Sequence, residues 1–304
     1  MFMKKKKKGN TLQRPRFTVM TAVMGLLLLI YSLVLIYMLV WAFMASVKDP
    51  VFEYTNNKLG LPQEWHFEHY IDVFKMFSLD VPNTSGDGTM NVGLLQMFLN
   101  SLLYSVGCAF AGTLCPCVMG YLCARFPYKF NKVIYFIVIV TMIITPVGNL
   151  PSEIRVAQSL GLYNHIWGLW IMKANFLGMY FLVFYGIFKG LPLAYTEAAK
   201  IDGAGNMSIF LRIMMPLVRS TFLTVFLINF IGFWNDYQVP LIYLPSYPTV
   251  AYGVFTMTTT TVNNMASIPM RMTAALLMLI PILVIFLTCQ KKLLGNLTVG
   301  GIKG

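Results

Sequence analysis

Long apolar runs separated by short polar segments occupy almost the whole chain. Each run is at least as long as the ~17 residues that a helix needs to cross a bilayer. The pattern predicts an all-α polytopic membrane protein with six transmembrane helices, forming one domain over 17–304 behind a basic tail at 1–16. The predicted spans are about 17–45, 92–123, 133–150, 166–188, 217–233 and 272–289.

Two predicted spans contain a proline, and one is interrupted by polar residues. Pro116 and Pro281 lie inside the second and sixth runs, where a proline removes a backbone donor and bends a helix. Lys173-Ala174-Asn175 breaks the fourth run. That break predicts a short apolar piece followed by the true membrane helix.

Three polar segments, at 46–91, 151–165 and 237–271, are predicted to be external loops. Within the first, certain positions recur at helical spacing, which predicts a short amphipathic helix on the membrane surface. These positions are His66, His69, Tyr70, Val73, Phe74 and Phe77. His66 and His69 have the spacing of metal ligands on a helix, but only Glu68 is nearby, so we predict no metal site.

Composition excludes a soluble domain, because only 11% of the 304 residues are charged whereas soluble domains carry about 25%. The run after the basic tail is too long for the apolar core of a signal peptide, so we interpret it as an uncleaved first span. The five cysteines lie in or at the ends of apolar runs. Cys115-Pro116-Cys117 lacks the spacing and the histidine of a zinc site, so we expect buried, reduced thiols.

The distribution of positive charge predicts the orientation in the bilayer. Seventeen of the 23 Lys and Arg residues lie in the N-terminal tail, at 125–132, around the segment 189–219, or in the C-terminal tail. The positive-inside rule therefore puts these segments and both termini in the cytoplasm. This distribution also explains the net charge of +12 without a nucleic-acid partner.

The polar segment EAAKIDGAGNMSIFLRIMMP, from Glu197 to Pro216, lies between two apolar runs on the predicted cytoplasmic side. Pro192 suits the first turn of a helix, and Gly203 and Gly205 permit a sharp turn. Either Asn206 or Ser208 can cap a second helix, and Pro216 predicts a bend. These residue types predict a helix–turn–helix, while an ordinary connecting loop remains the alternative.

The spacing within this segment is more specific than its composition. Glu197-Ala198-Ala199 is followed by three residues and Gly203, and nine further residues lead to Ile213-Met214-Met215-Pro216. The chain thereby resembles the permeases of ABC importers, whose EAA motif has this spacing with Leu where Met215 stands. Three further stretches resemble the carbohydrate branch, and in particular the maltose-type second permease subunit. They are Ile201-Asp202-Gly203-Ala204, Trp234-Asn235-Asp236, and the tail from Leu297-Thr298 to Lys303-Gly304.

The resemblance implies a type I ABC-importer permease architecture with a cytoplasmic coupling helix. That helix would lie in a groove of a cytoplasmic ATPase dimer, whose closure on ATP would switch the pathway from inward-facing to outward-facing. An exposed ion pair between Glu197 and the ATPase would contribute only about 1 kcal/mol or less, so shape should matter more than charge. The implied coupling residues are Glu197, Ala198, Ala199, Asp202, Gly203 and Pro216.

The resemblance also implies partners and a location. A second permease subunit would complete the pathway, and an extracellular solute-binding protein would deliver a sugar and contact the loop at 243–270. The chain would be a multi-pass protein of the plasma membrane. No G-x-x-x-x-G-K-[ST] phosphate loop occurs in it, so we expect it to bind no cofactor and not to be an enzyme. ATP and Mg²⁺ would bind to the separate ATPase.

Polar residues at membrane depth are candidates for the substrate pathway, because burying them in lipid is costly. They are Asn100, Lys173, Asn175, Asn229, Trp234, Asn235 and Asp236. Each also has a structural interpretation. The stretch 234–236 can mark the membrane interface, Lys173 can extend its amine toward water, and Asn229 can join neighbouring helices.

Two other functions compete with a carbohydrate importer. A secondary carrier driven by an ion gradient predicts internal inverted repeats with matching broken helices, and the sequence shows only the break at 173–175. An intramembrane enzyme needs a nucleophile–base set that the sequence does not bring together.

Overall fold

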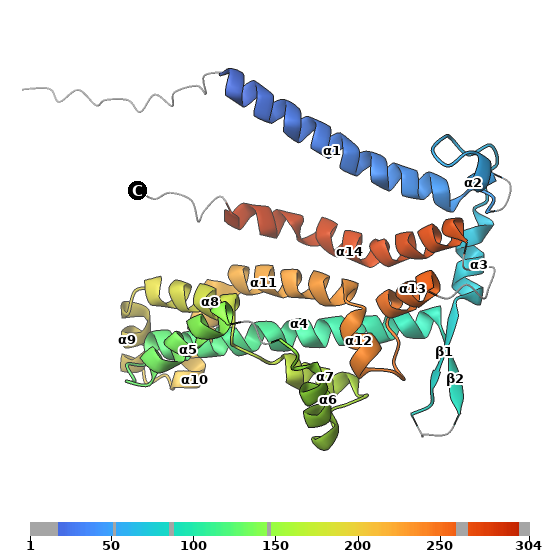
Figure 1. Ribbon diagram of the computed structural model, residues 1–304. Helices are drawn as coiled ribbons and strands as arrows, with labels where there is room; N and C mark the ends of the chain where they lie inside the picture. Colours follow the sequence, from blue (N-terminus) through green and yellow to red (C-terminus); the bar gives the residue numbers. More distant parts are fainter. Residues whose placement is uncertain (1–17, 51–52, 85–87, 145–146, 260–266, 298–304) are drawn as a thin grey trace, which may run out of the picture.

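The computed structural model describes residues 18–50, 53–84, 88–144, 147–259 and 267–297. Four long helices run lengthwise through the molecule (Figure 1). They are α1 (Val19–Ser46), α4 (Leu94–Arg125), α11 (Met215–Asn235) and α14 (Ile268–Leu297). The predictions for the basic tail at 1–16 and for the last residues from Thr298 lie outside the described residues.

In the part of the chain that the structure describes, four helices are long and apolar enough to cross a membrane. They cover Val19–Ser46, Leu94–Arg125, Asn206–Asn235 and Ile268–Ile285. Two shorter apolar helices are α5 (Asn131–Ile143) and α8 (Met179–Gly190). The chain is therefore a mostly helical membrane protein, and the four long helices coincide with four of the six predicted spans.

Helix α4 is the centre of the packing. It lies against α7 (Ile166–Lys173), α8 and α11. Small residues allow this close approach: a Cβ atom on Gly120 would lie 2.9 Å from the Cβ atom of Phe184, and one on Gly107 would overlap the Trp170 indole. The indole Nε1 of Trp170 donates a hydrogen bond of 3.0 Å to the carbonyl of Leu103.

The predicted break in the fourth run is confirmed, because α7 ends at Lys173 and α8 begins at Met179. The third run forms a shorter helix than predicted. It ends at Ile143, shortly before Pro146, and a proline disfavours helical backbone in the residues before it. Pro116 and Pro281, the two prolines predicted to lie inside spans, lie within the continuous helices α4 and α14.

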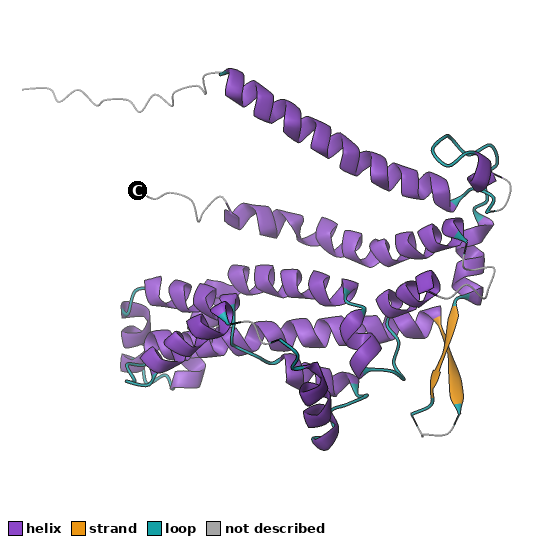
Figure 2. Ribbon diagram, in the orientation of Figure 1, coloured by secondary structure: helices purple, strands orange, loops and turns teal. Residues whose placement is uncertain are grey.

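One end of the molecule carries a small folded cap (Figure 2). It contains α2 (Glu53–Asn56), α3 (Glu68–Met76) and an antiparallel hairpin of β1 (Ser78–Pro82) with β2 (Thr89–Gly93). The predicted amphipathic helix is confirmed as α3, which buries His69 and Val73. The hairpin was not predicted. Its inward face consists of Val81 and Val92, which pack on Phe77 and Met97.

The other predicted external loops also contain helices. They are α6 (Leu150–Ser159), α12 (Gln238–Tyr243) and α13 (Val250–Thr259). The segment before α13 is tied to α4, because the amide of Val250 donates 2.8 Å to the Ser101 hydroxyl. These loops are therefore packed against the bundle.

Helix α1 is the least covered of the long helices. No residue in its most apolar stretch of 18 residues is buried, and the helix contacts α14. Its end is buried instead: Ser46, Val47 and Lys48 are almost completely covered, and the Lys48 amine donates 2.6 Å to each of the carbonyls of Asn57 and Gly60. The exposed side chains of α1 are apolar, so they are suited to contact with lipid or with another membrane helix.

Candidate functional site

The first half of the polar segment forms α9 (Ala194–Ile201) at the end of the bundle opposite the hairpin (Figure 1). Its residues favour a helix, because Glu197 and Lys200 lie in the first and last turns, where their charges complement the helix dipole. Leu193 is the N-cap residue. Pro192 therefore precedes the helix rather than occupying its first turn, as the sequence had suggested.

Gly203 ends α9 in the left-handed conformation. Its φ angle is +78°, a conformation that costs an L-residue about 1–2 kcal/mol. The Gly203 amide donates 3.0 Å to the Lys200 carbonyl, and the Ala204 amide donates 2.9 Å to the Ala199 carbonyl. A Cβ atom on Gly203 would meet nothing within 4 Å, so backbone conformation and not space requires glycine here.

The two faces of α9 have different surroundings. Ala199 is 6% exposed and belongs to a buried cluster with residues of α4 and α8. Other positions of α9 and of its C-cap residue are open to solvent, and we call this exposed surface the outer face of α9. It comprises Tyr195, Glu197, Ala198, Ile201 and Asp202, with Ile201 86% exposed.

The buried cluster fixes the position of α9 on the bundle. Tyr121 of α4 is at its centre: its ring centroid lies 4.8 Å from that of Phe210 and 5.3 Å from that of Phe188. Ile209 and Met214 complete the contact from the segment after α9. Ala199 thus packs inside this chain, whereas Ala198 is available to a partner.

After Gly203 the chain enters one continuous helical stretch, made of α10 (Asn206–Ile209), the π-helical turn η1 (Phe210–Met214) and α11. Gly205 is the N-cap residue of α10, so neither Asn206 nor Ser208 caps the helix as predicted. Pro216 follows the π-turn and lacks a backbone donor. The Met215 amide bonds to the Phe210 carbonyl, and this wider turn precedes the proline ring.

Four of the predicted pathway residues make hydrogen bonds between segments of this chain. The Asn100 amide donates 3.1 Å to the Pro248 carbonyl, and the Asn229 amide donates 3.1 Å to the Thr113 hydroxyl. The Trp234 indole, 3% exposed, donates 3.1 Å to the Met278 carbonyl. Asp236 accepts from the Tyr104 hydroxyl at 3.0 Å and from the Val239 amide at 3.1 Å.

The other three predicted pathway residues are Lys173, Asn175 and Asn235, of which the two asparagines are exposed. Asn175 accepts a bond of 2.8 Å from the Leu177 amide, and the exposed Asn235 donates 2.8 Å to the Ile231 carbonyl of its own helix. Half-buried Lys173 ends α7.

Gly112 of α4 brings two of the predicted residues together. A Cβ atom there would lie 3.4 Å from the Lys173 carbonyl and 3.8 Å from the Asn229 amide nitrogen. Lys173 and Asn229, from different helices, therefore both lie beside the same turn of α4.

Sequence reasoning missed the polar side of α4. Its buried polar and small residues recur at helical spacing, which marks one face of the helix. They are Ser101, Tyr104, Ser105, Cys108 and Thr113. This spacing is the signal that would have identified α4 as the helix surrounded by the others.

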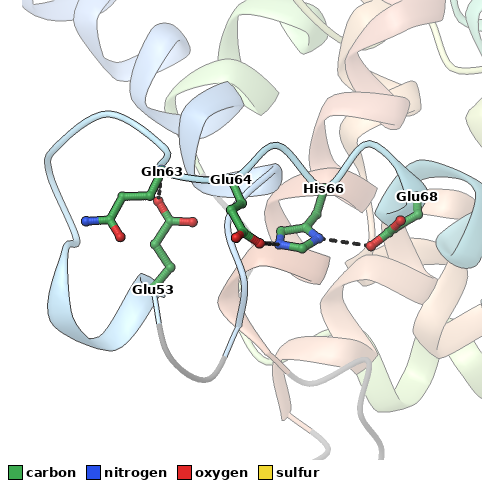
Figure 3. Close-up of polar contacts among 5 residues, drawn as sticks. All are labelled: Glu53, Gln63, Glu64, His66 and Glu68. Carbon is green, nitrogen blue, oxygen red and sulfur yellow. Dashed lines mark hydrogen bonds and ion pairs between the residues drawn. The ribbon is translucent and has the colours of Figure 1, made fainter.

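The cap at the hairpin end contains a chain of polar contacts (Figure 3). His66 Nδ1 lies 2.9 Å from Glu68 Oε1, and His66 Nε2 lies 3.7 Å from Glu64 Oε2. The hydrogen bond with Glu68 raises the pKa of His66 above its usual 6.5, while burial opposes that shift. Nearby, Glu53 Oε1 accepts a bond of 2.5 Å from the Gln63 amide.

These residues border a cavity of about 650 Å³. It is lined by Asp49, Glu53, Asn56, Asn57, Gln63, Glu64 and His66. Among the described residues, no group of three or more His, Cys, Asp or Glu side chains is placed to hold a metal ion. The cavity walls are instead fastened by internal bonds, such as the Gly60 amide to Asn57 Oδ1 at 2.9 Å.

A family model for the inner membrane component of binding-protein-dependent transport systems matches residues 117–294. The match covers more than half of the chain, which therefore belongs to this family of permease subunits. It includes α9, Gly203 and the π-turn, so the segment singled out by its EAA spacing lies inside the family's defining region.

Curated relatives match along most of their length. The diacetylchitobiose uptake system permease protein NgcG of Streptomyces coelicolor is 28% identical over 72% of this chain and 68% of its own length. The galactooligosaccharides transport system permease protein GanQ of Bacillus subtilis is 28% identical over 92% of this chain and 94% of its own.

A solved structure shares the fold. A bacterial ABC transporter involved in the import of the acidic polysaccharide alginate contains a chain that superposes with a TM-score of 0.74 at 20% identity. The match covers 91% of this chain and 99% of that one. The fold is thus that of an ABC-importer permease, and the family supports this interpretation over a secondary carrier.

Proposed function

We propose that this chain forms half of the membrane pathway of an ATP-driven importer for a sugar or oligosaccharide. The observation that carries the proposal is α9, a short helix with one face fixed on the bundle and its outer face uncovered. A rigid attachment of this kind can transmit a movement that a flexible loop would absorb. The names of the relatives, both permeases for oligosaccharides, support a carbohydrate substrate.

The outer face of α9 is the proposed contact with a cytoplasmic ATPase dimer. Ile201 and Ala198 offer an apolar surface, with Glu197 and Asp202 as polar neighbours. ATP and Mg²⁺ would bind to that ATPase, and this chain would carry out no chemistry. A second permease subunit and an extracellular solute-binding protein would complete the importer.

We propose six membrane spans with both termini in the cytoplasm. The four long helices would be joined as spans by α5 and α8. The start of α1, the end of α14 and α9 lie at the same end of the molecule (Figure 1), which supports a shared side for the positively charged segments. The cap with its hairpin lies at the opposite end, where the solute-binding protein would dock.

The pathway residues divide by their contacts. The exposed Asn175 and Asn235 remain candidates for substrate contact, as does the half-buried Lys173 at the break between α7 and α8. Asn100, Asn229, Trp234 and Asp236 instead bond to other segments of the chain, so their proposed role is to hold the helices that border the pathway.

The test is transport by the complex co-purified with this chain, in vesicles with its solute-binding protein. The sugar is first chosen by heat-stabilisation of that binding protein with diacetylchitobiose, galactooligosaccharides, maltodextrins and alginate oligosaccharides. We expect uptake of the stabilising sugar only when ATP is inside together with the ATPase. Uptake by this chain alone without nucleotide would overturn the proposal in favour of a carrier.

A further inference from the structure

The last turn of α4 contacts the segments on both sides of α9. On the near side it reaches the end of α8, which leads into α9. On the far side Tyr121 packs on Phe210 of the π-turn, which follows α9. The central helix of the bundle is thus joined to both ends of the proposed coupling segment.

The near-side contact is a hydrogen bond from Arg125. Its Nη2 atom donates 3.0 Å to the carbonyl of Leu191, the residue that caps α8. Carbonyls at a helix C-terminus have no partner within their own helix and carry partial negative charge, so a guanidinium is a favourable partner. Pro192 follows directly, so this bond holds the chain at the point where α9 is about to begin.

Arg125 lies at the end of α4 where this helix meets α5. The Nε atom of its guanidinium is buried, and no hydrogen-bond acceptor for it is found in the part of the chain that the structure describes. Two residues earlier, the carbonyl of Cys123 accepts 3.2 Å from the Asn131 amide of α5. The Asn131 bond thus holds the end of α4 from which Arg125 extends, and within the described residues its guanidinium bonds to Leu191.

We infer that Arg125 is a positioning residue that links the coupling segment to α4. Through the Leu191 carbonyl it makes a displacement of α9 also a displacement of α4, and hence of the helices packed around it. This inference rests on the proposed function. Without the bond, α9 would be joined to α4 only through the buried cluster around Tyr121, and more ATP would be hydrolysed for each sugar imported.

The experiment measures sugar imported per ATP hydrolysed by the reconstituted complex. In Arg125→Met we expect ATP hydrolysis within about twofold of the native rate and a ratio lower by about tenfold, within the usual range for coupling between two sites. Arg125→Lys retains a charged donor and should recover most of the ratio. Lys129→Met removes an exposed charge from the same loop and should leave the ratio unchanged.

Hydrogen–deuterium exchange on the purified chain gives a readout that needs no sugar. We expect the amides of 193–201 to exchange faster in Arg125→Met, with the amides of 100–120 unchanged. A native ratio in Arg125→Met, an equal loss in Lys129→Met, or faster exchange throughout α4 would each overturn the inference. If Arg125→Met is not recovered from the membrane, Arg125→Gln is judged by the same criteria.

Failure of the inference and failure of the proposed function give different results. If the chain does not associate with an ATPase at all, the proposed function fails. If association and ATP-driven uptake are normal in the native complex but Arg125→Met remains fully coupled, only the role of Arg125 is wrong.

Discussion

The hydroxyl of Tyr104 donates a hydrogen bond of 3.0 Å to Asp236, joining the middle of α4 to the end of α11. Tyr104 is 1% exposed, and its ring also packs edge-on against Phe233 at 5.8 Å between centroids. Asp236 is half-buried and is further held by the Val239 amide. Asp236, a predicted pathway residue, thus joins two of the long helices.

We therefore predict that Tyr104→Phe destabilises the chain without preventing its insertion. Hydrogen bonds to charged groups contribute about 1.5–3 kcal/mol, and the partial exposure of Asp236 places the expected loss near ~1 kcal/mol. The measurement is the thermal midpoint of the purified chain in detergent. Tyr128→Phe, at a tyrosine that is 68% exposed, is the control and should leave the midpoint unchanged.

Gly203 and Gly205 form a matched pair for testing the turn after α9. Gly203→Ala places an L-residue at φ +78°, with an expected cost of about 1–2 kcal/mol, and should distort the end of α9. Gly205 has φ −70° and no atom within 4 Å of an added Cβ, so Gly205→Ala should be tolerated. ATP-driven uptake should fall in the first variant only. Equal uptake in the two variants would show that the left-handed turn is dispensable.

Ala198 and Ala199 separate partner binding from folding. Ala198→Leu enlarges the exposed side of α9 and should weaken co-purification of the ATPase while the thermal midpoint stays native. Ala199→Leu overfills the buried cluster, which typically costs about 1–3 kcal/mol, and should lower the midpoint. A shift of the midpoint by Ala198→Leu as large as that caused by Ala199→Leu would contradict the two-faced description of α9.

The ion pairs of His66 with Glu64 and Glu68 predict a pH dependence of the stability of the cap. Because its folded pKa is raised above 6.5, the protonated form stabilises the folded state. This contribution is complete below pH 6.5 and is lost as pH rises through the higher folded pKa. Glu64 and Glu68 face the ring as partners, His69 stacks on it at 5.6 Å, and Asp49 adds a more distant negative charge.

The measurement compares thermal midpoints of the native chain and His66→Gln at pH 6 and pH 8.5. We expect the native chain to exceed the variant by more at pH 6. His165→Gln, at a histidine stacked on Trp167, is the control and should show a smaller difference between the two pH values. A larger advantage of the native chain at pH 8.5 would refute the assigned sign.

Apolar length and periodicity were sufficient to predict the long helices and the amphipathic α3. The hairpin escaped prediction because β1 and β2 are five residues each and alternate only briefly. The end of α5 at Ile143 depended on a proline just beyond it, which an apolar run does not register. The conformation of a short element depends on its tertiary contacts. Val81 and Val92 of the hairpin pack in a cluster with residues of helices that are distant in sequence.

For the site, residue spacing located α9 and its glycine turn, since these depend on local chemistry. It did not assign the polar residues in the bundle. Asn100 and Pro248 are far apart in sequence, as are Asn229 and Thr113, and one sequence does not reveal such pairs. Arg125 was treated as one of several basic residues in a loop, because its bond to Leu191 exists only once α4 and α8 are packed together.

The π-turn at Phe210–Met214 gives the helix one residue more than a regular α-helical turn would hold. Each residue advances an α-helix by about 100°, so this extra residue sets the angular phase between α10 and α11. Deleting one residue here would close the turn and rotate the segment before it relative to α11, so the outer face of α9 would turn away from the proposed ATPase. The number of residues between Gly203 and Ile213, which is nine, thus fixes the rotation of α10 relative to α11. Homologous chains that lack the wide turn should have a different number of residues in this segment.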